Sequence, residues 1–202
     1  PVINGGDVKN KGIEVGLSWN DNIGRDFTYS VGANFAYNHN EVGNIPTLVG
    51  IIHGKDNQIF QNAEEFYRAE NGHAIGYFWG YKTAGIFQNQ KEINDWIAAG
   101  NGIYQADVKP GDVKYVDINH DGVINASDKV DLGNGLPKYT FGFNVNLAWK
   151  GFDLSANFTG AAGFQIAQSY RDPSSSQANY SRRILKRWTG EGTSNEIPRV
   201  TY

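Results

Sequence analysis

Two stretches of the chain alternate between apolar and polar residues, and this period of two constrains the fold more than any other feature. In the first, every second residue over 13–19 and 27–37 is aliphatic or aromatic, and the residues between are mostly small or polar. In the second, residues 139–149 and 152–158 repeat the pattern on either side of Lys150 and Gly151. This period is typical of β-strands whose two faces meet different environments. Each stretch therefore predicts a β-hairpin, the first with a turn at 20–26.

Two kinds of all-β fold have such strands. A soluble sandwich places the apolar face in a core, whereas a membrane barrel turns it toward lipid and keeps the polar face in a wet lumen. The runs cover roughly ten residues, which is about what a tilted strand needs to cross a bilayer. Trp19, Tyr37, Tyr139 and Trp149 are placed near the ends of the predicted strands, where barrels carry aromatic girdles. Alternation alone leaves both folds open.

Several classes of protein are excluded by composition. The chain has no cysteine, which removes disulfides, thiolate nucleophiles and cysteine-based zinc sites. Its formal net charge is -3 with dispersed lysine and arginine, so nucleic acid is not expected as a partner. No apolar run approaches the length of a membrane-spanning helix, and any crossing would have to use strands. Because the sequence begins at Pro1, contains no methionine and shows no leader, we expect an internal piece of a longer chain.

Residues 39–138 form a long connection between the predicted hairpins. Short helices are expected at 62–69 and 90–99, and an aromatic strand interrupted by glycine at 77–87. If both tight turns lie on one side of a membrane, this connection contains an even number of crossings, and we favour zero. The predicted organisation is a barrel hairpin at 1–38, a long loop region at 39–138, and at 139–202 a second hairpin with a following extracellular segment.

The strongest local motif occupies residues 117–128. Oxygen-bearing side chains at the first, third, fifth, ninth and twelfth positions, with Gly122 at the sixth, fit the calcium loop of an EF-hand or dockerin. The expected ligands are Asp117, Asn119, Asp121, the Val123 carbonyl, Asn125 and Asp128. The pattern departs from an EF-hand in ending on Asp128 rather than glutamate and in lacking flanking amphipathic helices. The alternative is a polar turn that binds no ion.

No catalytic constellation is evident. The four histidines are spread through predicted loops, and neither a nucleophile elbow nor a phosphate-binding glycine loop is present. The chain is therefore not expected to be an enzyme. The aromatic string at 77–81 has two interpretations, a surface that stacks on sugar rings and a packed core strand.

Several short segments, taken in order, resemble the C-terminal region of the SusC/RagA family of TonB-dependent outer-membrane receptors. They are residues 8–14, 38–42, 76–88, 109–116, 137–144, 150–154, 187–190 and 197–199. The resemblance implies an outer-membrane β-barrel that pairs with a SusD-like surface lipoprotein and imports oligosaccharides or peptides with energy from TonB. It also implies contact with outer-membrane lipid, and a plug domain and TonB box at an N-terminal end that this sequence does not contain. The terminal aromatic strand typical of the family is not evident before Tyr202.

One alternative from another class remains, a soluble calcium-dependent carbohydrate-binding β-domain. The two hypotheses differ in where the apolar face of the hairpins lies. A continuous outward band favours the receptor, and convergence into a closed core favours the soluble domain. The diagnostic residues are Phe27, Tyr29, Phe35, Phe141, Phe143 and Phe158.

Overall fold

The computed structural model of the chain describes residues 5–169 and 179–200. Its strands and single α-helix are β1 (Asp7–Ile23), β2 (Phe27–Gly43), β3 (Ile51–His53), β4 (Tyr67–Glu70), β5 (Tyr77–Tyr81), β6 (Thr83–Ile86), α1 (Gln90–Ala98), β7 (Val113–Tyr115), β8 (Lys129–Asp131), β9 (Tyr139–Trp149) and β10 (Phe152–Ala162). Two short 3-10 helices occupy Ala126–Asp128 and Arg182–Lys186. The fold is thus mainly antiparallel β, and the chain divides into two compact units.

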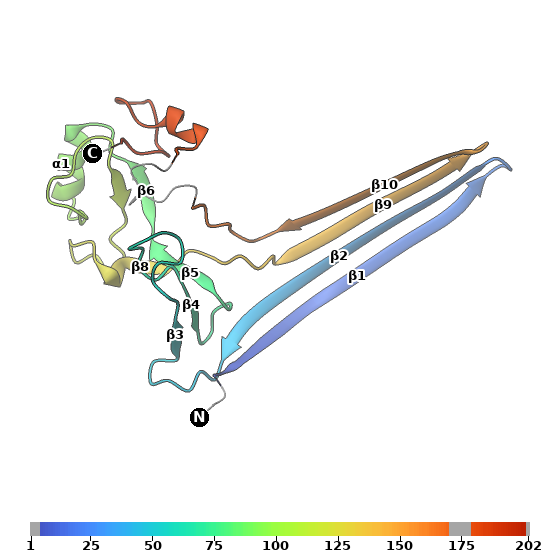
Figure 1. Ribbon diagram of the computed structural model, residues 1–202, viewed down its shortest axis with the longest axis horizontal. Helices are drawn as coiled ribbons and strands as arrows, with labels where there is room; N and C mark the ends of the chain where they lie inside the picture. The colour runs from blue at the N-terminus through green and yellow to red at the C-terminus, as the bar shows by residue number, and fades with distance from the viewer. Residues whose placement is uncertain (1–4, 170–178, 201–202) are drawn as a thin grey trace. The chain divides into compact units, whose positions relative to one another are not determined.

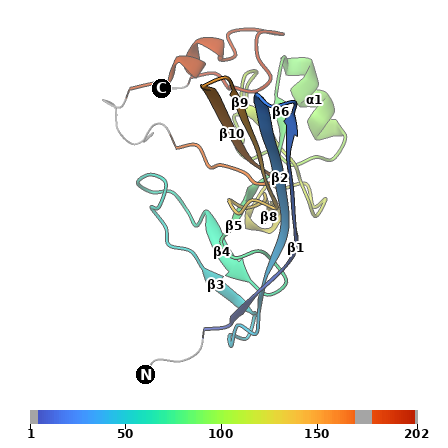
Figure 2. The same cartoon turned by 90° about the vertical axis from the view of Figure 1, so that its right-hand side faces the viewer.

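The first unit is built on four long antiparallel strands in the order β1-β2-β9-β10 (Figure 1). Figure 2 shows the same four strands side by side in a second view. Both predicted hairpins are present, and β2 pairs directly with β9 although residues 44–138 lie between them. The register places Leu17, Ala33, Phe143 and Phe158 in one row across the sheet. Every second residue of each strand therefore shares one face.

The first hairpin is longer than the alternation predicted. β1 continues to Ile23, so the turn shrinks from 20–26 to 24–26, with Gly24 in the left-handed region at φ 67°. Trp19 consequently lies inside β1, and its predicted position at a strand end is wrong. At the other end β2 continues past residue 38 to Gly43, because residues 38–43 pair there with Asp7–Gly12. Tyr37 therefore lies inside β2, and its predicted position at a strand end is wrong as well.

Residues 44–138, all of which the structure describes, contain only short strands. These strands have three to five residues, and they form a β3-β4-β5-β8 sheet and a β6-β7 pair. None approaches the ~9–11 residues that a strand needs to cross a bilayer. That the connection adds no crossing stays a prediction. Within the described residues, no helix combines the length and the apolar character that crossing a membrane requires.

The predicted helix at 62–69 is wrong. Asn62 adopts φ 64°, and its backbone N–H is accepted by the side chain of Asn57 at 2.5 Å, which ends any helical path there. β4 begins at Tyr67, and Phe66 stacks on Phe78 with ring centroids 5.0 Å apart. Pairing with a distant strand overrides the local helix propensity of this segment.

The second predicted helix is confirmed as α1. The Asn89 side chain accepts the Glu92 backbone N–H at 2.9 Å and caps the first turn. Ile93 is buried, and Trp96 meets Phe87 edge-on at 6.0 Å. Gly100, at φ 82°, follows the last turn as a C-terminal stop signal predicts.

The aromatic string forms packed strands. β5 and β6 are separated at Lys82 and not at a glycine. Tyr77 is fully buried, and the guanidinium of Arg68 lies 3.9 Å from the centre of the Trp79 ring. These contacts favour the core interpretation over a sugar-stacking surface.

Candidate functional site

The four-stranded sheet carries an apolar face of six residue rows. The rows begin at Ile13, Val15, Leu17, Trp19, Asp21 and Ile23 of β1 and run across β2, β9 and β10. On β2, β9 and β10, every residue in these rows is aliphatic, aromatic, alanine or glycine. Asp21 is the exception, and it lies one row from the Ile23 row that adjoins the turn. From Ile13 to Ile23 the strand rises ~34 Å, which becomes ~26 Å at a tilt of about 40°.

This face is not closed into a core within the described residues. Leu17 is 70% exposed and Phe143 is 47% exposed, and Phe35, Phe141 and Phe158 are exposed as well. Phe27 and Tyr29, the other two diagnostic residues, are half-buried on the same face and stack on one another. The distribution is that of a continuous outward band.

The opposite face is polar and tightly fitted between strands. Asn146 donates to the Ser30 hydroxyl at 3.0 Å and accepts from Ser155 at 2.7 Å, which links β2, β9 and β10. A Cβ on Gly32 would lie 2.3 Å from the Asn144 amide oxygen, so glycine makes room for that amide. Such a face suits contact with water rather than with hydrocarbon.

Aromatic residues mark both ends of the band. Tyr37 and Tyr139 share the row farthest from the turns, with ring centroids 5.4 Å apart. Trp149 lies in the row next to the turns, beside Phe27 and Phe152. Three of the four predicted girdle residues therefore flank the band, and Trp19 does not.

The calcium-like loop lies in the second unit and is curled around its own acidic side chains. Asp117 accepts the backbone N–H groups of Asp121 at 3.3 Å and Gly122 at 2.7 Å. Asp128 accepts those of Ile118 at 2.9 Å and Asn125 at 2.8 Å. Gly122 has φ 81°, which permits the tight turn. The first and last positions of the motif are thereby drawn into one ring.

Two carboxylates are buried in this ring. Asp117 is 2% exposed and Asp128 is fully buried. The backbone N–H of Asn125, followed by those of Ile118 and Asn119 and by the neighbouring Asp117 side chain, holds the pKa of Asp128 below its ordinary value despite burial. Two adjacent buried carboxylates repel one another unless a cation or a proton lies between them.

The donor chemistry fits a hard cation. Asn119, Asn125 and the Val123 carbonyl supply neutral oxygens of the kind calcium accepts beside carboxylates. No group of three or more acidic or histidine side chains is gathered for a metal within the described part of the chain. Asp121 instead accepts the Val123 backbone N–H at 2.9 Å and the Asn119 amide at 2.9 Å. The loop thus brings Asp117 and Asp128 together and leaves Asp121 engaged with its neighbours.

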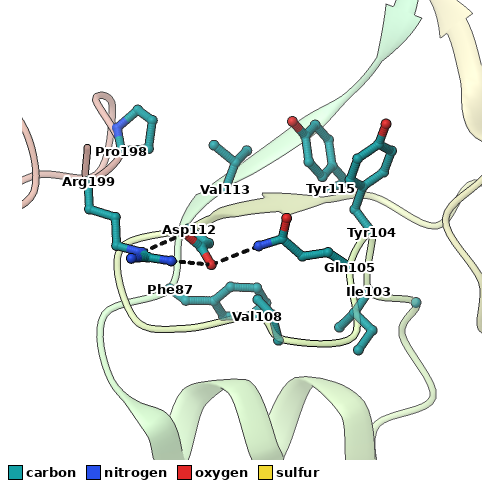
Figure 3. A pocket seen from close by; sticks show the side chains of 11 residues that line it. Phe87, Ile103, Tyr104, Gln105, Val108, Asp112, Val113, Tyr115, Pro198 and Arg199 are labelled. Atoms are coloured by element: carbon teal, nitrogen blue, oxygen red, sulfur yellow. Dashed lines mark hydrogen bonds and ion pairs between the residues drawn. The ribbon is translucent and has the colours of Figure 1, made fainter. Parts of the chain in front are cut away.

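A cavity of about 250 Å³ lies beside this loop in the second unit (Figure 3). Phe87 and Val108 lie along one side in the figure, Tyr104 and Tyr115 form one end, and Arg199 lies at the other. Burial, aided by the neighbouring tyrosines, raises the pKa of Tyr115, so its hydroxyl stays protonated.

An ion pair forms the polar end of the cavity. Arg199 Nε lies 2.7 Å from one oxygen of Asp112, and Nη2 lies 3.3 Å from the other. That second oxygen also accepts the Lys109 backbone N–H at 2.9 Å and the Gln105 amide at 3.1 Å. The carboxylate is therefore occupied by partners from three parts of the chain.

Comparison with known proteins gives one consistent result. The chain is 28% identical over 200 residues to TonB-dependent receptor P3 of Formosa agariphila, covering 98% of this chain and 19% of that receptor. It is 32% identical over 132 residues to TonB-dependent receptor P26 of the same organism, covering 64% and 13%. It is 25% identical over 177 residues to the TonB-dependent receptor SusC of Bacteroides thetaiotaomicron, covering 87% and 16%. The chain is similar, over nearly all of its length, to TonB-dependent receptors. No family model matches it.

Solved structures agree with this assignment at the level of the fold. The RagAB peptide importer in its open-open state superposes with a TM-score of 0.61 at 20% identity, covering 98% of this chain and 20% of that chain. The chain spans about one fifth of the length of TonB-dependent receptor P3, as the 19% coverage shows. The SusC/RagA resemblance predicted from the motifs is confirmed.

The cavity of this receptor segment was not predicted from the sequence. Phe87, Asp112 and Arg199 come from three of the segments that carried the family resemblance, yet Asp112 and Arg199 are 87 residues apart. The sequence did mark Lys109–Asp112 and residues 197–199 as parts of two motif segments. That signal did not indicate that the two segments touch.

The closeness of Gly111 to the C-terminal segment gives a testable prediction. Gly111 has φ 93°, and a Cβ there would lie 2.5 Å from the Trp188 ring and 2.9 Å from Arg199. Gly111→Ala should therefore destabilise the docking of residues 187–199 by about 2 kcal/mol. Limited trypsin digestion of the complete receptor should therefore cut at Lys186 and Arg187 faster in the Gly111→Ala variant than in the parent. Gly190→Ala is the matched control, since no atom lies within 4 Å of a Cβ there; equal cleavage of both variants would contradict the prediction.

Proposed function

We propose that this chain contributes four strands and an extramembrane region to an outer-membrane β-barrel receptor that imports a nutrient with energy from TonB. The observation that carries the proposal is the apolar face of six rows on the β1-β2-β9-β10 sheet. Its estimated height of ~26 Å matches the ~25 Å apolar band of outer-membrane barrels. The polar face opposite it would line the lumen.

The edges of the sheet support a place within a larger wall. β1 and β10 are its outer strands, and each pairs on one side only among the described residues. An unpaired edge is a template for a further strand, so neighbouring strands of the barrel would pair with both. The location proposed for the complete protein is the cell outer membrane, with lipid against the apolar face.

The partners proposed are a SusD-like surface lipoprotein and TonB. The likeness to SusC and to the RagAB peptide importer supports this assignment, and these relatives are named as receptors and importers rather than enzymes. The cargo is an oligosaccharide or a peptide. The soluble calcium-dependent carbohydrate-binding domain is disfavoured, because it would bury the apolar face that is exposed here.

The metal proposed for residues 117–128 is calcium, in a structural role. Asp117 and Asp128 would supply the charge, and Asn119, Asn125 and the Val123 carbonyl would supply neutral oxygens, with Asp121 joining after it releases its present partners. The ion would relieve the repulsion between two buried carboxylates and stiffen the loop.

Cysteine accessibility in the complete receptor tests the membrane placement. Phe141→Cys and Thr140→Cys place single thiols on opposite faces of β9, in a segment that has no cysteine of its own. In outer membranes, we expect a charged maleimide to label the Thr140→Cys thiol at least tenfold faster than the Phe141→Cys thiol. Phe141→Cys should instead react with a lipid-soluble maleimide. Equal labelling of both thiols by the charged reagent would refute the barrel-wall placement.

A further inference from the structure

The cavity between Arg199 and the Tyr104–Tyr115 pair has the dimensions of a site for a single ring. Its volume is about 250 Å³, slightly below the ~300–1,000 Å³ of pockets that hold drug-sized ligands. Arg199 lies at one end and the two tyrosines lie at the other (Figure 3). A compact ring fits this small volume better than an extended chain, which needs a longer groove.

The charges of the cavity select against an ionic ligand. The guanidinium of Arg199 is paired through two contacts with Asp112, at 2.7 and 3.3 Å. A carboxylate or an ammonium ligand would meet a charge that its partner already neutralises, and displacing either member would leave the other without its counter-charge. The pair instead presents a neutral surface with guanidinium N–H groups left over as donors.

The remaining polar groups both donate and accept. The Tyr104 and Tyr115 hydroxyls can do either, and the amide oxygen of Gln105 accepts while its nitrogen is held by Asp112 at 3.1 Å. Phe87 and the tyrosine rings supply apolar faces. A ligand that carries hydroxyl groups around a ring with apolar C–H faces satisfies both kinds of surface.

The calcium-like loop lies behind one wall of this cavity. Ile103 forms a parallel β-bridge with Val123, the residue whose carbonyl is proposed as a metal ligand. A Cβ on Gly102 would lie 2.9 Å from the backbone of both Val123 and Ile124, so the wall and the loop are in direct backbone contact. Tyr104 and Gln105 follow directly in the chain. A shift of Val123 would therefore displace the backbone that carries Tyr104 and Gln105.

We propose that this cavity binds one neutral, hydroxyl-rich ring, a single sugar residue, and that metal binding at residues 117–128 sets the position of its Gly102–Gln105 wall. Tyr104 provides the ring face at the mouth, where it is 57% exposed. Gln105 and Arg199 provide directed hydrogen bonds. The dependence on metal rests on the calcium site proposed above, whereas the sugar site itself does not.

Saturation-transfer NMR on the complete receptor in detergent micelles tests the proposal. The probes are the methyl glycosides of glucose, galactose, mannose, xylose and N-acetylglucosamine, with glucuronate and N-acetylalaninamide as charged and peptide-like comparisons. At least one neutral glycoside should receive saturation, and Tyr104→Ala and Gln105→Ala should each reduce that signal at least fivefold. Tyr180→Ala is the matched control, since Tyr180 is an exposed tyrosine outside the cavity lining, and it should leave the signal unchanged.

Other outcomes would each refute one part of the proposals. If no glycoside gives a signal that depends on Tyr104, or if only N-acetylalaninamide or glucuronate does, the sugar site is refuted. If the sugar signal is the same in calcium and in EGTA, and the same in Asp117→Ala, the coupling to the metal loop is refuted. A parent receptor that binds the glycoside but imports no nutrient would count against the proposed transport function and leave this site standing.

Discussion

Replacing Leu17 by arginine in the complete receptor should destabilise the barrel by about 2–4 kcal/mol, since a charge on the lipid face near the midplane carries that cost. Leu17 lies in the third of the six apolar rows and is 70% exposed on that face. The measurement is the urea midpoint of heat-modifiable mobility on gels, with the receptor folded into lipid vesicles.

The neighbouring residue provides the control. Ser18 is adjacent in β1 and points to the polar face, opposite Gly32. Ser18→Arg introduces the same charge on the polar face, which is the proposed lumen side, and the free energy of unfolding should differ from that of the parent by less than about 1 kcal/mol. If Ser18→Arg destabilises as much as Leu17→Arg, the assignment of the two faces is wrong.

Calcium should bind to residues 117–128, and Asp117→Ala combined with Asp121→Ala should abolish that binding. These two changes remove a buried carboxylate and one that could reorient toward the ion. Isothermal titration of the complete receptor with calcium measures the heat directly. At a free calcium concentration of 100 times Kd, the ion would stabilise the folded loop by about 2.7 kcal/mol.

A second measurement is the amount of the proposed partner that co-purifies with the receptor. If the proposed SusD-like lipoprotein contacts the region ordered by residues 117–128, its co-purification should fall in the double variant, while heat-modifiable mobility of the barrel stays unchanged. Asp131→Ala is the control, because Asp131 follows the loop in β8 and is exposed. A parent receptor that shows no calcium-dependent heat would leave residues 117–128 as a polar turn without an ion.

Local patterns predicted the parts of the fold that local forces determine. The alternation in β9 and β10 and the tight turn at Lys150–Gly151 appear in the structure as expected, since period two and turn residues act over a few neighbours. The helix at 90–99 likewise follows from its own cap at Asn89 and its stop at Gly100.

Non-local contacts account for the failures. Residues 62–69 have helical propensity, but Phe66 stacks on Phe78, and β4 takes the place of the helix. The cavity depends on Asp112 and Arg199, which are 87 residues apart, and no spacing rule joins them. The calcium-like loop was recognised because all its possible donors lie within twelve consecutive positions. Whether it holds calcium stays a prediction.

The direct pairing of β2 with β9 has a consequence for the rate of assembly. Residues 44–138 must be spanned before these two strands can meet. Closing a flexible loop of about 95 residues costs ~4 kcal/mol in its length-dependent entropy alone. If this segment folds first, its ends are held closer and part of that barrier is removed before the strands pair. Substitutions in the second unit, such as those that loosen α1 or the loop at 117–128, would then slow pairing of the second hairpin with β2 without removing any contact from the four-stranded sheet.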